Sequence, residues 1–463
     1  MSAQALGAKR GAVNMTEGNI LRHIIKFSIP LLIGNLFQLM YNMVDTWVVG
    51  NYVSNEAYAA VGTVGPVINT LIGCFMGFST GAGVVISQYY GARDEKNVSR
   101  VTHTAIAITL ILCAVFTVVG VFMTPYMVKF MKTPENVTDE AIEYLRIYFA
   151  GISGLLIYNM GSAILRAVGD SKRPFYFILA SAVINTILDL VFVLALGMGV
   201  AGVAYATVIA QGISALLVLI SLFLTKNCTK ISISKISINP SLLLKIVKIG
   251  IPTAIQLMLT AFSNVFVQSY INNFDSEYIM SGYTSYNKID QILLVPIQAV
   301  SLAATTFVGQ NLGVRDTERA KRGFLSCIGI TLVSTAVMLV PVLIFAPELV
   351  SFFNSEPEVI KYGALFLRLL SPFYLACCID MIFAATFRGA GNAKVSMIIM
   401  LSSYVAFRQA YLFIVSRYIS NTIEAIIFAY PAGWLVAMAA SLIYYKIKGL
   451  DSKNVVTDSK KEK

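Results

Sequence analysis

The sequence predicts an all-α polytopic membrane protein in which twelve transmembrane helices form two parallel six-helix repeats around a central cleft. Three observations lead to this prediction. The composition is too apolar for a water-soluble domain, the apolar segments have membrane-spanning length, and a repeat relates the two halves of the chain. Each observation also limits what the protein can do.

The composition predicts that most of the chain lies in a lipid bilayer. Of its 463 residues, 57% are hydrophobic and only 13% are charged, whereas soluble domains carry about a quarter charged residues. Spanning segments in lipid must satisfy their own backbone hydrogen bonds, so such long apolar runs are helices. The net charge of +11 comes from Lys and Arg spread over short loops, not from one basic face. A nucleic-acid partner is therefore not expected.

Twelve apolar runs are long enough to cross about 30 Å of hydrocarbon, which takes about 20 helical residues. They lie near residues 24–50, 57–89, 99–122, 142–165, 174–196, 200–224, 246–274, 276–308, 320–345, 359–387, 395–416 and 419–447. The first run lacks a small-residue cleavage site, so we expect a retained helix and not a signal peptide.

A polar stretch between the sixth and seventh runs divides the chain. We expect an amino-terminal six-helix bundle at 1–225, a cytoplasmic linker at 226–241 and a carboxy-terminal bundle at 242–450. The tail at 451–463 is polar, and we expect it to be disordered.

The distribution of Lys and Arg predicts the orientation. Both termini and the loops on their side of the membrane carry 27 Lys and Arg, whereas the opposite loops and helix ends carry six. The positive-inside rule then places both termini in the cytoplasm. We expect a multi-pass protein of a prokaryotic cytoplasmic membrane.

The chain also matches itself at one constant offset. Pro30 meets Pro252, the loop QYYGARDEKNVSR (88–100) meets QNLGVRDTERAKR (310–322), and RAVGDSK (166–172) meets RGAGNAK (388–394). Six spans per half give both halves the same orientation, and parallel repeats of this kind are typical of alternating-access transporters with a substrate site between the halves. In the first loop pair, Gly91 and Gly313 are expected to cap the preceding helices.

The sequence resembles the multidrug and toxic compound extrusion (MATE) family, in the multidrug/oligosaccharidyl-lipid/polysaccharide flippase superfamily. The resemblance rests on Pro30 with MVDTWVVG (43–50), on the YYGARD and RAVGDSK loops, and on NTILD (185–189). It implies a monomeric antiporter that exchanges sodium or protons for bulky, often cationic drugs, with no cofactor beyond the coupling ion. It also implies a cation site, sodium-binding if sodium is the coupling ion, at Asp45, Asn185, Asp189 and Thr207.

The depth of these four residues supports the same site independently. At about 1.5 Å per residue, Asp45 lies about 8 Å from the outer end of its helix, and Asp189 and Thr207 each lie about 10 Å from theirs. Asn185 precedes Asp189 by four residues and so faces the same way. Ionisable groups at such depth are costly and usually mark ion pathways.

The chemistry of this layer suits a hard cation or a proton. Two carboxylates, an amide oxygen and a hydroxyl form a set of oxygen ligands, and burial beside a like charge favours protonation of a carboxylate. The equivalent positions of the second repeat hold Val267, Phe407, Tyr411 and Ala429, so the second half has lost the acids. We therefore expect the first half to sense the ion and the second to contribute mainly substrate surface.

The second half has its own charges within predicted spans. Lys288, Asp290, Asp380 and Arg408 have opposite signs, and we expect them to neutralise one another, with a substrate-facing Asp290 or Asp380 as the alternative. The possible substrate-cleft residues are Gln38, Tyr41, Gln256, Asp290 and Asp380.

Drug–cation antiport is the leading functional prediction, and small organic molecules and the bilayer are the expected partners. The alternative is a flippase for lipid-linked oligosaccharides, but such proteins often have more spans or a cavity lined with cations that bind phosphates, and this sequence has twelve spans and few buried cations. An enzyme is not expected, since no HExxH, GxSxG or comparable catalytic pattern occurs.

Overall fold

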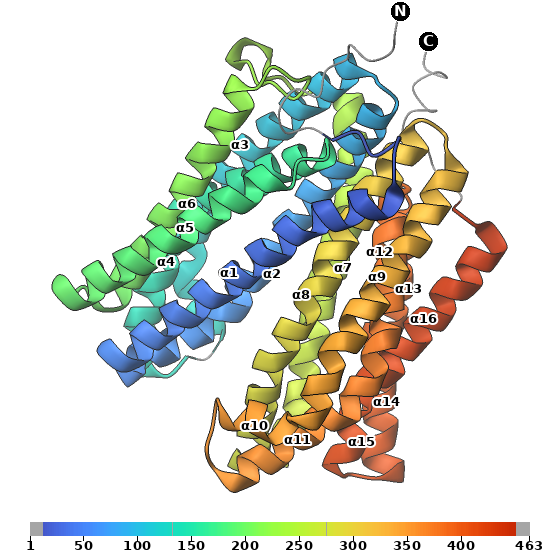
Figure 1. The fold of residues 1–463 in the computed structure, drawn as a ribbon. Helices are drawn as coiled ribbons and strands as arrows, with labels where there is room; N and C mark the ends of the chain where they lie inside the picture. The colour runs from blue at the N-terminus through green and yellow to red at the C-terminus, as the bar shows by residue number, and fades with distance from the viewer. Residues whose placement is uncertain (1–12, 132, 275, 451–463) are drawn as a thin grey trace, which may run out of the picture. The chain divides into compact units, whose positions relative to one another are not determined.

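The computed structural model describes residues 13–131, 133–274 and 276–450, and these residues form helices joined by short loops (Figure 1). The predicted disordered tail at 451–463 lies outside the described residues. Within the described chain, twelve helical segments are long and apolar enough to cross a membrane, which confirms the predicted fold class and number of spans.

The first six spans follow one another with tight connections. They are α1 (Ile20–Tyr52), α2 (Asn55–Gly91), α3 (Glu95–Phe130), α4 (Glu135–Ala167), α5 (Lys172–Asp189) with its π-helical continuation η1 (Leu190–Ala195), and α6 (Gly199–Leu224). The linker that follows contains one 3-10 turn, η2 (Ile233–Lys235).

The second six spans include more interruptions. The uninterrupted spans are α7 (Pro240–Asn272), α8 (Glu277–Gly313) and α9 (Thr317–Ile344), followed by the short α10 (Ala346–Ser351). The tenth span consists of α11 (Pro357–Leu370), η3 (Ser371–Phe373) and α12 (Tyr374–Gly389). The eleventh consists of α13 (Ala393–Met400), η4 (Leu401–Phe407), α14 (Arg408–Ile414) and η5 (Val415–Ile419). The twelfth consists of α15 (Ile423–Ile427) and α16 (Ala429–Lys448).

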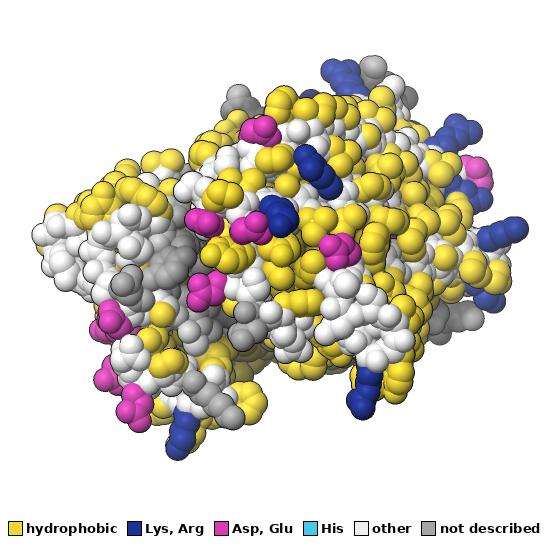
Figure 2. All heavy atoms as spheres, turned by 90° about the horizontal axis from the view of Figure 1, so that it is seen from below, with side chains coloured by type: hydrophobic (Ala, Val, Ile, Leu, Met, Phe, Trp, Pro, Cys, Tyr) yellow, Lys and Arg dark blue, Asp and Glu magenta, His cyan; other side chains and the backbone are white. Residues whose placement is uncertain are grey.

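Large apolar side chains remain exposed along the spans, as a lipid solvent requires. Leu110 is 47% exposed, Phe122 74% and Val333 66%. Figure 2 shows wide hydrophobic areas with few acidic and basic side chains among them. A surface of this kind is stable only against hydrocarbon.

The described chain forms two compact units, and each unit includes a short segment from the other half of the sequence. Unit 1 contains residues 13–14 and Ile29–Gly250, and unit 2 contains Met15–Ser28 and residues 251–450. The first turns of α1 therefore pack with unit 2, where Arg319 donates to the Gly18 carbonyl over 2.9 Å. The first turns of α7 pack with unit 1, where Lys245 Nζ donates to the Tyr89 hydroxyl over 3.1 Å. The two crossing points, after Ser28 and after Gly250, occupy equivalent positions of the sequence repeat.

The same pairs of helices pack within each unit. In unit 1, α4 packs against α2, α3 and α6; in unit 2, α12 packs against α8, α9 and α16 in the corresponding way. The approach of α4 to α6 depends on glycine, because a Cβ on Gly154 would lie 2.8 Å from the Gly212 nitrogen. This repeated packing is the structural counterpart of the sequence repeat.

The repeated GxRD loops end and start helices in the same way in both units. The prediction that Gly91 and Gly313 cap their helices is wrong: each is the last helical residue, and the left-handed conformation falls on Arg93 (φ 56°) and Arg315 (φ 65°). The next residue, Asp94 or Asp316, accepts a backbone N–H as the N-cap of the following helix.

Candidate functional site

The polar layer of unit 1 is built around Asp45 on α1. Its carboxyl lies within hydrogen-bonding range of the Asp189 carboxyl at the end of α5 and of the Thr207 hydroxyl on α6. Thr207 donates its own proton to the Val203 carbonyl over 3.0 Å, so its lone pairs face the layer. Three helices thus bring three of the four predicted residues together.

Asp189 and Asn185 are fixed on a locally distorted helix. Asn185 lies one turn before Asp189 and is 1% exposed, while Asp189 is fully buried. Directly after Asp189 the helix widens into the π-helical turn η1, a distortion that is frequent at functional sites. Ser181 on the same helix donates to the Ala210 carbonyl over 2.8 Å and holds α5 against α6.

Several polar atoms of this layer have no hydrogen-bond partner within the described residues. Asp45 Oδ1, both carboxyl oxygens of Asp189 and both amide atoms of Asn185 are buried without a hydrogen-bond donor or acceptor within the described part of the chain. No Lys or Arg in that part forms an ion pair with either acid. Two acceptors that face each other in this way are stable only with a shared proton or a bound cation.

Tyrosine side chains surround the acids. Tyr41 on α1 and Tyr144 on α4 lie close enough to interact electrostatically with Asp45. Tyr41 also interacts with Gln38, and Tyr148 with Gln211 on α6. The structure therefore places the predicted cleft residues Gln38 and Tyr41 beside the polar layer of unit 1.

In unit 2, Asp290 is held by hydroxyl groups. Tyr374 on α12 donates to its Oδ1 through a short hydrogen bond, and Tyr286 donates to the same oxygen over 3.4 Å. The two hydroxyls are themselves 3.3 Å apart.

Both carboxyl oxygens of Asp380 likewise accept a hydrogen bond from a hydroxyl group. The Tyr404 hydroxyl donates to its Oδ2 over 3.0 Å, and Ser441 on α16 donates to its Oδ1 over 3.2 Å. Asp380 is 0% exposed, so these bonds replace its hydration.

Arg408 is buried between neutral groups. Its Nη1 donates to Asn264 Oδ1 over 2.8 Å, and its guanidinium lies 4.9 Å from the Tyr404 ring centre and 4.8 Å from that of Tyr430. Cation–π contacts of this kind are favourable when desolvated.

The expected mutual neutralisation of the four charges in unit 2 is therefore not found. Within the described residues none of Lys288, Asp290, Asp380 and Arg408 pairs directly with another. Lys288 is exposed and lies over the Phe353 ring at 5.2 Å. Hydroxyl groups contact Asp290 and Asp380, and an amide oxygen and two aromatic rings contact Arg408.

Gln256, the last predicted cleft residue, joins α7 to α13. It accepts from the Ser396 hydroxyl over 3.0 Å, donates to the Met400 sulfur and is 3% exposed. Its polar atoms are used in packing within unit 2.

A model of the MatE family matches residues 30–191 and 252–411, which together make up more than two thirds of the chain. The chain belongs to the MatE family. The two matched segments begin at the two prolines of the repeat, Pro30 and Pro252. It is therefore a multi-pass membrane transporter and not an enzyme.

Known MatE proteins are similar over nearly the whole chain. The probable multidrug resistance protein YpnP of Bacillus subtilis is 28% identical, over 94% of this chain and 97% of its own length. The FAD transporter of Shewanella oneidensis is 23% identical, over 86% of this chain and 88% of its own. The structure of a MOP superfamily transporter from Pyrococcus furiosus superposes with a TM-score of 0.91 at 25% identity, covering 96% of this chain and 100% of that one.

Two tyrosines beside the polar layer, Tyr144 and Tyr148, were missed by sequence reasoning. Tyr144 and Tyr148 stack with ring centres 6.4 Å apart on α4 and are both buried. Their signal in the sequence was an i, i+4 pair of hydroxyl-bearing rings within an otherwise apolar span.

Proposed function

We propose that this MatE protein is a secondary antiporter that exports organic, cationic compounds in exchange for sodium or protons. The coupling ion binds at Asp45, Asn185, Asp189 and Thr207. The observation that carries the proposal is the pair of facing carboxyls, which lack donors and basic partners in the described residues. Relatives named multidrug resistance proteins support the choice of substrate class.

Coupling follows from the repulsion between the two acids. With both carboxyls ionised, like charges at close range in a medium of low dielectric drive α1 away from α5. A proton or a sodium ion removes this repulsion and lets the layer close, so ion binding favours one arrangement of these helices over another. No cofactor is needed for this exchange.

The surroundings of the layer suit cationic substrates. Tyr41 and Tyr144 lie close to Asp45, and aromatic rings attract organic cations. An organic cation and the coupling ion then compete for the same negative charge, which is the simplest basis for exchange. The bias of Lys and Arg supports cytoplasmic termini, and one chain carries the whole coupling site.

Dye efflux from vesicles with separately imposed gradients tests the proposal. A fluorescent organic cation is loaded, and a sodium gradient, a proton gradient or neither is then applied. We expect efflux driven by one gradient, and its loss in Asp45→Asn and Asp189→Asn. Glu318→Gln, at an exposed acid that forms an ion pair with Lys321, is the matched control and should retain efflux. Efflux that neither gradient drives would contradict antiport.

The alternative, flipping of lipid-linked oligosaccharides, needs cations that face the phosphates. Among the described Lys and Arg, only Arg408 is almost fully buried by solvent exposure. Its guanidinium already donates to Asn264 Oδ1 and contacts two aromatic rings, so it is not available to a phosphate. Transfer of a lipid-linked sugar across the same vesicles, with no dye efflux, would favour the flippase instead.

A further inference from the structure

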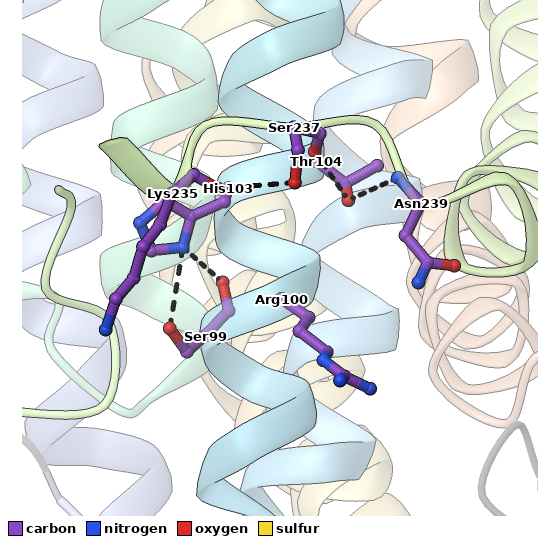
Figure 3. A pocket seen from close by; sticks show the side chains of 7 residues that line it. All are labelled: Ser99, Arg100, His103, Thr104, Lys235, Ser237 and Asn239. Carbon is purple, nitrogen blue, oxygen red and sulfur yellow. Dashed lines mark hydrogen bonds between the residues drawn. The ribbon is translucent and has the colours of Figure 1, made fainter. Parts of the chain in front are cut away.

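A polar cavity of about 400 Å³ lies in unit 1 between α3 and the linker that follows α6 (Figure 3). We call it the linker pocket; it is lined by Ser99, Arg100, His103, Thr104, Lys235, Ser237 and Asn239. A neighbouring hollow of about 550 Å³ shares Ser99 and Lys235 with it and adds Lys96 and Lys230. The pocket is separate from the cation layer and has no part in the proposed exchange.

The walls of the pocket are fixed by hydrogen bonds between α3 and the linker. His103 donates from Nδ1 to the Ser99 carbonyl over 2.6 Å and accepts the Ser232 N–H at Nε2 over 3.1 Å. Thr104 Oγ1 accepts the Asn239 N–H over 3.2 Å and donates to the Ser237 carbonyl over 3.3 Å. The two ring nitrogens of His103 therefore tie α3 to the linker.

The charge of the pocket is positive. Figure 3 shows Arg100 extending from α3 and Lys235 from the linker. No acid lines the pocket, and within the described chain neither cation has an ion-pair partner. The adjoining hollow contains one acid, Glu95, against three lysines. Figure 3 shows the charged ends of these two side chains on opposite sides of Ser99. Two cations that flank a surface with a hydroxyl group and no acid attract an anionic phosphate group.

The position along α3 places the pocket at the level of lipid headgroups. The 36 residues of α3 extend about 54 Å, well beyond about 30 Å of hydrocarbon. Exposed apolar residues on α3 begin at Leu110, so Arg100 lies outside the hydrocarbon. Ile233 and Ile238 flank Lys235 on the linker and are 77% and 41% exposed. Exposed isoleucines beside lysines are typical of segments that rest in the membrane interface.

We propose that the linker pocket binds the phosphate of an anionic phospholipid. Arg100 and Lys235 pair with the phosphate oxygens, Ser99 and Asn239 supply neutral hydrogen bonds, and Ile233 and Ile238 contact the acyl region. Basic pockets at the cytoplasmic ends of spans are suited to such headgroups. A bound lipid holds the linker against α3 and so fixes the connection between the sixth and seventh spans.

Native mass spectrometry of the purified chain tests this site. The protein is incubated with equal amounts of phosphatidylglycerol and phosphatidylcholine, and in a second arm with inorganic phosphate. We expect wild type to retain phosphatidylglycerol preferentially, and Arg100→Ala/Lys235→Ala to lose this preference on the order of tenfold. Both side chains are exposed, so folding should be unaffected; Lys235→Glu is a second variant that should weaken binding further.

Arg322→Ala is the matched control, because Arg322 is exposed like Arg100 and occupies the equivalent position of the second repeat. It should retain the lipid like wild type. Equal lipid retention in wild type and in the double variant overturns the proposal, as does equal loss in Arg322→Ala. Retention of inorganic phosphate in place of the lipid overturns the assignment to a lipid.

Discussion

Units 1 and 2 share a helical arrangement, but their buried acids differ in whether they accept hydrogen bonds from the protein. In unit 2, Asp290 accepts from Tyr374 and Tyr286, and Asp380 accepts from Tyr404 and Ser441. In unit 1, both oxygens of Asp189 and one of Asp45 are buried without a donor from the described residues. Buried polar groups in proteins are normally hydrogen-bonded.

In the function that we propose, this difference separates acids that stabilise the fold from acids that bind the coupling ion. A carboxylate with two hydroxyl donors is already solvated by the protein, so removing it disturbs packing. A carboxylate that faces another carboxylate lacks this solvation, and a proton or sodium ion supplies it. The burial of the acid alone does not distinguish the two cases, but its hydrogen-bond donors do.

The equivalent positions of unit 2 provide few ligand atoms for a cation. Val267 and Ala429 are fully buried and apolar, and the Tyr411 hydroxyl donates to the Ala425 carbonyl over 3.2 Å. Phe407 is 41% exposed and adds no ligand. The repeat thus provides a comparison within one chain, and mutations in unit 1 and in unit 2 can test it.

The largest effect is expected from neutralising the acids of unit 1. Asp45→Asn or Asp189→Asn should reduce gradient-driven dye efflux to background, because the remaining single carboxylate neither repels nor shares an ion. Asp290→Asn and Asp380→Asn should keep the dependence of efflux on the coupling ion, since their hydroxyl donors can still bond an amide oxygen. Initial efflux rates at several ion concentrations provide the measurement.

Membrane insertion of each variant, checked by size-exclusion profile, is the control for this comparison. Full efflux by Asp45→Asn would remove that residue from the coupling site. A loss of ion dependence in Asp380→Asn would move coupling to unit 2.

A smaller effect is expected at the neutral ligands of the layer. Thr207→Val keeps the shape of the side chain but removes one ligand oxygen, and Asn185→Leu removes the amide. Each should raise the half-saturating concentration of the coupling ion on the order of tenfold, as loss of one hydrogen-bond-like contact implies. The maximal efflux rate should change little. Unchanged ion dependence in both variants would restrict the site to the two acids.

The smallest effect on transport is expected from the tyrosines of unit 2. Tyr404→Phe leaves Asp380 short of one donor in a fully buried position and should lower the free energy of unfolding by about 1–3 kcal/mol. Tyr411→Phe, whose hydroxyl is only partly buried, should cost less. Chemical denaturation in micelles measures both. Normal stability of Tyr404→Phe, together with altered ion dependence, would indicate that Asp380 takes part in coupling.

Much of this architecture could be predicted from the sequence because lipid imposes a simple rule on composition. The twelve spans follow from the length of the apolar runs. The depth of Asp45, Asp189 and Thr207 follows from the constant rise per residue of an α-helix. Counting residues gives depth without the direction in which a side chain points, so the contact between Asp45 and Asp189 needed the structure.

The remaining features depend on contacts between distant segments. The exchange of Met15–Ser28 and of the start of α7 between units leaves no mark in local hydropathy. The π-turn after Asp189 departs from the regular helical period on which the prediction rests. Tyr374 and Tyr404 bind their acids from other spans, so charge alone wrongly suggested that the acids and bases of unit 2 would pair.

Hydrogen exchange of the purified protein, with and without the coupling ion, tests the central claim most directly. Sodium is added or removed, or the pH is changed, and amide protection is compared helix by helix. Ion binding at the layer should increase protection in α1, α5 and α6, where the two acids and Thr207 lie. Helix α7 and the spans formed by α13 to α16 should change much less. The same comparison in Asp45→Asn should show no ion-dependent change. An equal or larger response in the spans of unit 2 would contradict the account.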